Sequence, residues 1–279
     1  MRIVKTRGIV VVGAALLLLM SACGDDDAGD TSTTAAAATT AAPATTAAPA
    51  TTAAPTTAAP LAGDAVQGGV LYDKWWKVLG LEEPAGDSPV WARQATNERS
   101  GGDSWRCKEC HGWDYQGADG AYGSGSHFTG FPGVFGSSLS VEAMIAQIGG
   151  QTDPDHDFSA MGDQAMADLA ALISSALEDV SGFIGDDKAI VGGDLANGEA
   201  LFAATCSGCH GADGTQINFH DADDPTFVGT VALDNPWEFF HKVRFGQPGT
   251  GMPSAVTNGW SLQDVADVVA YSQTLPDGG

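Results

Sequence analysis

Two short segments of the sequence carry the residues whose types and spacing can do chemistry. They read "CKECH" at 107–111 and "CSGCH" at 206–210, so each places two cysteines three positions apart with a histidine directly after the second. In a C-x-x-C-H segment the thiols can bond the two vinyl groups of one porphyrin edge, and the imidazole can bind its iron. The sequence therefore predicts two covalently bound haem c groups, attached through Cys107, Cys110, Cys206 and Cys209, with His111 and His210 as proximal iron ligands.

Other uses of cysteine explain the two segments less well. A thioredoxin-like C-x-x-C pair needs no following histidine and is not expected twice. A zinc site needs four ligands that converge on one ion, whereas each pair here has its own histidine. Structural disulfides stay open as an alternative in an exported protein. The fifth cysteine, Cys23, lies far from both segments.

An internal repeat surrounds the two segments. "DAVQGGVLY" at 64–72 and "DLANGEALF" at 194–202 share the pattern D-x-x-x-G-x-x-L-aromatic. After each C-x-x-C-H segment the apolar periodicity predicts a helix, one within 161–177 and one within 261–275, where Ser261 and Asp264 form a capping pair. The chain is therefore predicted to be mainly α-helical, with one domain at 63–182, a linker at 183–192 and a second copy of the domain at 193–279.

These segments, together with "GMP" at 251–253 and the flanking helices, resemble class I cytochromes c. The resemblance covers both predicted domains, as a tandem dihaem arrangement. It implies that an N-terminal and a C-terminal helix cross in each domain, and that a loop supplies the sixth iron ligand from the far side of the haem. It also implies electron transfer, without naming a donor or an acceptor.

The sixth ligand of the second haem is predicted to be Met252. Proline after this residue and glycines before it suit a tight loop, and the distal methionine of the resembled family has such a setting. This assignment leaves His220 and His241 as spare residues, at the surface or beside the haem propionates.

The sixth ligand of the first haem must be chosen from "QTDPDHDFSAM" at 151–161. Aligning the two closing helices puts Met161 opposite Trp260, directly before the helix, where an apolar residue packs on the first turn. The same alignment puts His156 at the position of Met252. We predict His156 as the distal ligand, and Met161, His127 or an open site are the alternatives.

The predicted ligands set a direction for electrons. A second imidazole lowers the potential of a haem, whereas a thioether raises it. We therefore expect a low-potential bis-histidine haem in the first domain and a higher-potential one in the second.

The first domain contains an insertion at about 73–106. Leu71 lies thirty-six residues before Cys107, whereas the matching Leu201 lies only five before Cys206. The insertion holds four tryptophans, Trp75, Trp76, Trp91 and Trp105. It is either an extra layer that shields the haem edge, or a surface for a partner or for the haem–haem contact.

The N-terminal region predicts export. Residues 1–22 place basic residues, an apolar run and small residues before Cys23, as in a signal peptide, and "MSAC" resembles a bacterial lipobox. Cys23 is then lipidated, and the protein is held at the outer face of the cytoplasmic membrane, in a periplasm or at the cell surface. An uncleaved anchor is the alternative. Residues 23–62 form a Thr/Ala/Pro-rich stalk, with or without O-glycosylation, that is too polar and proline-rich to fold.

Charge and motifs narrow the function. The net charge of −23 excludes nucleic acid as a partner and favours redox partners with basic docking surfaces, although adaptation to salt or acid would give the same charge. No Ser/His/Asp, paired-carboxylate or phosphate-loop pattern appears, so no catalytic residue is predicted. An electron carrier is expected. The alternative is a dihaem enzyme of the thiosulfate dehydrogenase or peroxidase type, which needs one iron with a displaceable or absent sixth ligand.

Overall fold

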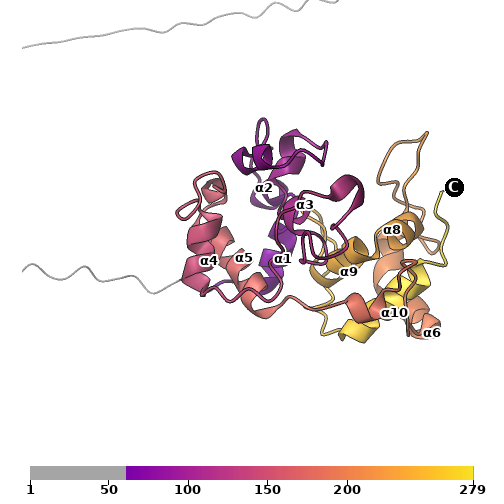
Figure 1. Cartoon of the computed structure of the whole chain (residues 1–279). Helices are drawn as coiled ribbons and strands as arrows, with labels where there is room; N and C mark the ends of the chain where they lie inside the picture. The colour runs from indigo at the N-terminus through magenta and orange to yellow at the C-terminus, as the bar shows by residue number, and fades with distance from the viewer. Residues whose placement is uncertain (1–60, 279) are drawn as a thin grey trace, which may run out of the picture. The chain divides into compact units, whose positions relative to one another are not determined.

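Helices form nearly all the regular structure of the computed structural model, which describes residues 61–278 (Figure 1). They are α1 (Ala65–Leu71), α2 (Trp75–Leu79), α3 (Cys107–His111), α4 (Val141–Ile148), α5 (Asp163–Ser175), α6 (Leu195–Leu201), α7 (Ser207–His210), α8 (Val228–Asp234), α9 (Pro236–Phe245) and α10 (Leu262–Ser272). Short 3-10 turns and one π-helical segment, Phe202–Cys206, connect them. Within the described residues β structure is limited to isolated bridges. The prediction of a mainly α-helical chain is confirmed for this part.

Two helix pairs of the same construction organise these residues. Helix α1 packs on α5, and α6 packs on α10. An aspartate caps the first helix of each pair: Asp64 and Asp194 each accept hydrogen bonds from the backbone N–H groups two and three residues further on. Such a carboxylate satisfies free donors and complements the positive end of the helix.

The glycine of the repeated sequence pattern is explained by how closely the helices approach. A Cβ atom on Gly68 would lie 2.1 Å from the carbonyl oxygen of Asp168, and one on Gly198 would lie 2.0 Å from that of Asp267. A side chain at either position would force the two backbones apart, so only glycine permits the contact. The aspartates on α5 and α10 are also equivalent, because each accepts a 2.8 Å hydrogen bond from the backbone N–H of the N-cap residue.

The insertion folds onto the first helix pair. Trp75 and Trp76 are each 2% exposed and belong to the hydrophobic core of that pair. Three indole N–H groups donate to backbone carbonyls inside the insertion: that of Trp75 to Trp105, that of Trp91 to Arg99 and that of Trp105 to Gly86. Burial of these tryptophans favours the interpretation of the insertion as an extra packed layer, and disfavours the alternative that it is a docking surface.

Helix α9 follows the second C-x-x-C-H segment in the chain but also packs on α1. Phe245 at its end belongs to the first hydrophobic core, and a Cβ atom on Gly69 would lie 2.1 Å from the Phe245 ring. Residues 61–278 accordingly fall within a single compact unit.

The predictions for the signal segment, Cys23 and nearly all of the stalk lie outside the described residues. No helix among residues 61–278 has both the length and the apolar content needed to cross a membrane.

Candidate haem sites

A pocket with a cavity volume of about 360 Å³ lies beside the first C-x-x-C-H segment. Cys107, Cys110 and His111 line it from α3. Its remaining wall is largely apolar and comes from the end of α1, the insertion, α4, α5 and the loops before these two helices, with Tyr72, Val90, Phe131, Val134, Met144, Ile148 and Leu169 among its residues. A mainly apolar cavity with a few polar groups at fixed positions is the usual form of a cofactor site.

His111 is oriented by its backbone surroundings. Its Nδ1 atom lies 2.7 Å from the carbonyl oxygen of Pro132, so this nitrogen carries the proton and donates. Desolvation lowers the pKa of His111 to about 4, and the imidazole is therefore neutral near pH 7. The Nε2 atom is left with a free lone pair, as an iron ligand requires.

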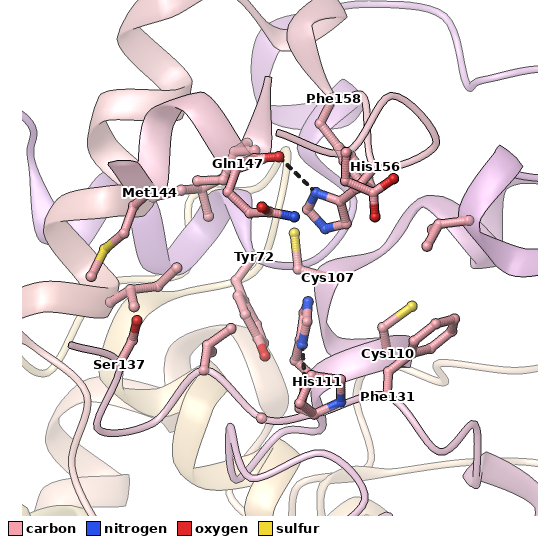
Figure 2. A pocket seen from close by; sticks show the side chains of 18 of the residues that line it. Tyr72, Cys107, Cys110, His111, Phe131, Ser137, Met144, Gln147, His156 and Phe158 are labelled. Carbon is pink, nitrogen blue, oxygen red and sulfur yellow. Dashed lines mark hydrogen bonds between the residues drawn. The ribbon is translucent and has the colours of Figure 1, made fainter. Parts of the chain in front are cut away.

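His156 faces His111 across the pocket (Figure 2). Its Nδ1 atom lies 3.0 Å from the carbonyl oxygen of Gln147, which again leaves Nε2 as the free nitrogen. The two ring centroids are 6.2 Å apart and the ring planes are inclined by 65°.

This separation fits one metal ion between the two rings. An imidazole nitrogen bonds a first-row metal at about 2.0–2.1 Å and lies roughly 1.1 Å from its ring centre, so opposed imidazoles have centres about 6.3 Å apart. The residues present therefore fit a haem held by two thioethers on one edge and two imidazoles on its faces.

The two side chains weighed against His156 lie elsewhere. Met161 ends the 3-10 turn η4 (Ser159–Met161) directly before α5, is 5% exposed, and belongs to the first core. The Nδ1 atom of His127 lies 2.9 Å from a carboxylate oxygen of Glu109, and its ring stacks on Tyr122. Of the three candidates, His156 is the one that lines the pocket with His111.

Glu109 forms a buried ionic cluster that the sequence analysis did not identify. This residue lies between the two cysteines of "CKECH" and is 0% exposed. Its carboxylate accepts from Asn97 at 3.0 Å, contacts the Nε atom of Arg99 at 3.3 Å, and pairs with His127 and Lys108. Burial alone raises the pKa of Glu109, but the hydrogen bond from His127 and the charge of Lys108 outweigh it and hold the pKa well below its usual range. A fixed negative charge therefore lies beside the first site.

The second C-x-x-C-H segment forms a similar turn but is more open to solvent. Cys206 ends the π-helical segment and is half-buried, whereas Cys209 is exposed. His210 ends α7, and its Nδ1 atom is buried without a hydrogen-bond partner among the described residues. Desolvation lowers the pKa of His210, so its imidazole is neutral and able to bind a metal.

Met252 lies in the loop between α9 and α10. It is half-buried and packs against the same hydrophobic core as Cys206. The turn before it is tight, because Gly246 has φ +101° and a Cβ atom there would lie 2.8 Å from the carbonyl oxygen of Met252. The second set of residues is thus arranged around a shared core, whereas the first set faces across a pocket.

The two spare histidines differ. His220 is at the surface, with 56% of its side chain exposed. His241 is 2% exposed and lies between α1 and the Trp113–Tyr115 segment, so the expectation of a surface position is wrong for it. Sequence alone could not show this, because the contacts join residues far apart in the chain.

Residues 193–271 match the family model described as cytochrome c oxidase, cbb3-type, subunit III. The matched segment contains "CSGCH" and Met252, and leaves "CKECH" outside. A comparison with curated proteins gave no match. The family match supports a cytochrome c domain over these residues, which implies covalently bound haem c and haem-based electron transfer.

Proposed function

We propose that this protein is a dihaem c-type cytochrome that carries electrons between redox partners. The observation that carries the proposal is the pair His111 and His156, which face each other across a pocket whose wall includes Cys107 and Cys110. The second haem is supported by the family match, and the first by this geometry and by the repeated helix pair.

The polypeptide has a limited set of tasks in this function. A haem iron supplies one-electron exchange between its ferric and ferrous states when bound. Cys107 and Cys110 would hold the first haem covalently, and His111 and His156 would bind its iron. Apolar residues of the pocket wall exclude water. If His111 and His156 both bind the iron, no ligand position would remain for a substrate at the first site, which favours a carrier over a dihaem enzyme.

The second site has a different proposed iron ligand, and this difference sets the direction of electron transfer. A thioether from Met252 raises the potential of its haem above that of a bis-histidine haem. A haem bound by Met252 and His210 would therefore accept electrons from one bound by His111 and His156, and the exposed Cys209 would mark the edge through which they leave.

The sequence supports the setting of this transfer. A lipid on Cys23 anchors the chain to the outer face of the cytoplasmic membrane, and the Thr/Ala/Pro stalk separates the haem domains from it. The acidic chain docks on redox partners with basic surfaces.

Haem stoichiometry tests the proposal. Mass spectrometry of the full chain, made in a host with haem-attachment machinery, is expected to find two haems. The double variants Cys107→Ser/Cys110→Ser and Cys206→Ser/Cys209→Ser are each expected to carry one. A single haem on the wild-type chain would contradict the dihaem proposal, and rapid cyanide binding to the ferric protein would favour the dihaem enzyme.

A further inference from the structure

The loop that carries His156 is held on two sides. On one side it is fastened to the end of α4: the Nδ1 atom of His156 donates to the carbonyl of Gln147, and the backbone N–H of Phe158 donates to the carbonyl of Ile148 at 2.9 Å. This support resembles an ordinary turn after a helix.

On the other side the loop is fastened to the insertion. The guanidinium of Arg93 donates to both carboxylate oxygens of Asp153, at 2.6 and 2.7 Å, and to Asp155 at 2.5 Å. The backbone N–H of Val90 donates to the carbonyl of Asp155 at 3.1 Å. Arg93 and Val90 both belong to the insertion, and both line the pocket.

The Arg93 contacts reach His156 through the backbone. The N–H of His156 donates to the carbonyl of Asp153 at 2.9 Å. Asp153, which the guanidinium binds through its side chain, therefore also closes the turn that carries the His156 imidazole. Asp155 directly precedes His156. Holding these two aspartates therefore fixes the backbone on the N-terminal side of the candidate ligand.

The geometry and the charges make the ion pairs of Arg93 with Asp153 and Asp155 stronger than a usual surface ion pair. Isolated exposed ion pairs contribute little, and 44% of the Arg93 side chain is exposed. However, a planar guanidinium that binds one carboxylate with two bonds and a second with a third is a specific clamp that lysine cannot reproduce. Asp153, Asp155 and Asp157 place three negative charges in one short loop, and without Arg93 their mutual repulsion would not be compensated by this guanidinium.

We propose that Arg93 is a positioning residue that keeps His156 opposite His111, and that this is a function of the insertion. The inference rests on the proposed function in one respect, namely that His156 binds the first iron. It also accounts for a difference between the two repeats. Where the first repeat has the insertion at 73–106, the second has only the three residues 203–205, and its Met252 loop is instead shaped by glycines and Pro253.

The test uses the full haem-loaded chain and three variants. Arg93→Gln removes the clamp, Arg93→Lys keeps the charge without the fork, and Lys77→Gln removes an exposed cation of the same insertion as a control. We expect Arg93→Gln to speed cyanide binding at the first ferric haem by about tenfold or more, the factor that corresponds to losing a charge-assisted hydrogen bond. Arg93→Lys should lie between Arg93→Gln and the wild type, and Lys77→Gln should match the wild type.

Hydrogen exchange of the amides at 151–158 separates the clamp from the ligand assignment. Arg93→Gln is expected to accelerate exchange there and to leave α10 unchanged. Unchanged exchange in the loop would overturn the proposal. Faster exchange with unaltered cyanide binding would also overturn it, because the clamp would then not act on the iron. If His156→Ala leaves the first haem's spectrum unaltered, the ligand assignment in the proposed function fails, whatever the loop does.

Discussion

Tyr115 and His241 lie 126 positions apart in the chain and share a hydrogen bond of 2.7 Å at a buried site. The Nε2 atom of the same imidazole lies 2.9 Å from the carbonyl oxygen of Gly69, which can only accept, so Nε2 carries the proton. Nδ1 then accepts from the Tyr115 hydroxyl. One neutral side chain of α9 therefore joins two segments of the first repeat.

The first prediction concerns the pH dependence of this joint. Burial, with a contribution from the charge of Lys242, lowers the pKa of His241 to about 3. The unfolded chain, with an ordinary histidine pKa near 6.5, binds the proton first, so His241 contributes stability above about pH 6.5 and loses it as pH falls toward 3. Urea unfolding of the wild type and His241→Gln between pH 7 and 4 should show this contribution fading by up to about 1.4 kcal/mol per pH unit. Parallel curves for the two proteins would contradict it.

A second prediction concerns the buried charge of Asp73. This side chain is 1% exposed and pairs with Arg106 and Lys242, each at 2.5 Å. Asp73→Asn removes the buried carboxylate that two partly buried cations share, leaving Lys242 without its ion pair and Arg106 with Asp103 alone, and about 3–5 kcal/mol of unfolding free energy should be lost. Asp103→Asn is the control, since Asp103 pairs with the same Arg106 but is 42% exposed, and it should cost less than about 1 kcal/mol. Equal losses in urea unfolding would refute the difference.

Helix crossing gives a third prediction. Gly198→Ala places a methyl group 2.0 Å from the backbone carbonyl of Asp267, so α6 and α10 must separate. Overpacking of this kind costs about 1–3 kcal/mol. Gly182→Ala, at a position with no atom within 4 Å of the new methyl group, should leave the thermal midpoint unchanged. Thermal unfolding of both variants checks the prediction, and a stable Gly198→Ala protein would contradict the close approach.

The fourth prediction concerns the potential of the first haem. Glu109 keeps a buried negative charge between the two attaching cysteines. A negative charge stabilises the ferric state of the haem more than the ferrous state. Glu109→Gln removes that charge, and the midpoint potential of the first haem should therefore rise. Glu98→Gln, in the exposed part of the insertion, should leave it unchanged in a redox titration. A fall in potential, or equal shifts in the two variants, would contradict this role.

Local patterns predicted much of the fold. The D-x-x-x-G-x-x-L pattern marks two capped helices, and the Ser261–Asp264 capping box is present at the start of α10, because these features depend on neighbours in the chain. Three features could not be predicted, because each depends on contacts between distant segments. They are the position of His241, the ionic cluster of Glu109, and the ion pairs of Arg93 with Asp153 and Asp155. Tryptophan content alone also could not separate a packed layer from a docking surface.

The central claim is that His111 and His156 bind one iron and that Met161 does not. Electron paramagnetic resonance of the ferric protein, compared with His156→Ala and Met161→Leu, tests it most directly. We expect His156→Ala to change the first haem's signal and to leave the second unchanged, while Met161→Leu keeps both signals because it preserves an apolar core residue. If only Met161→Leu changes the first haem's signal, the account is contradicted.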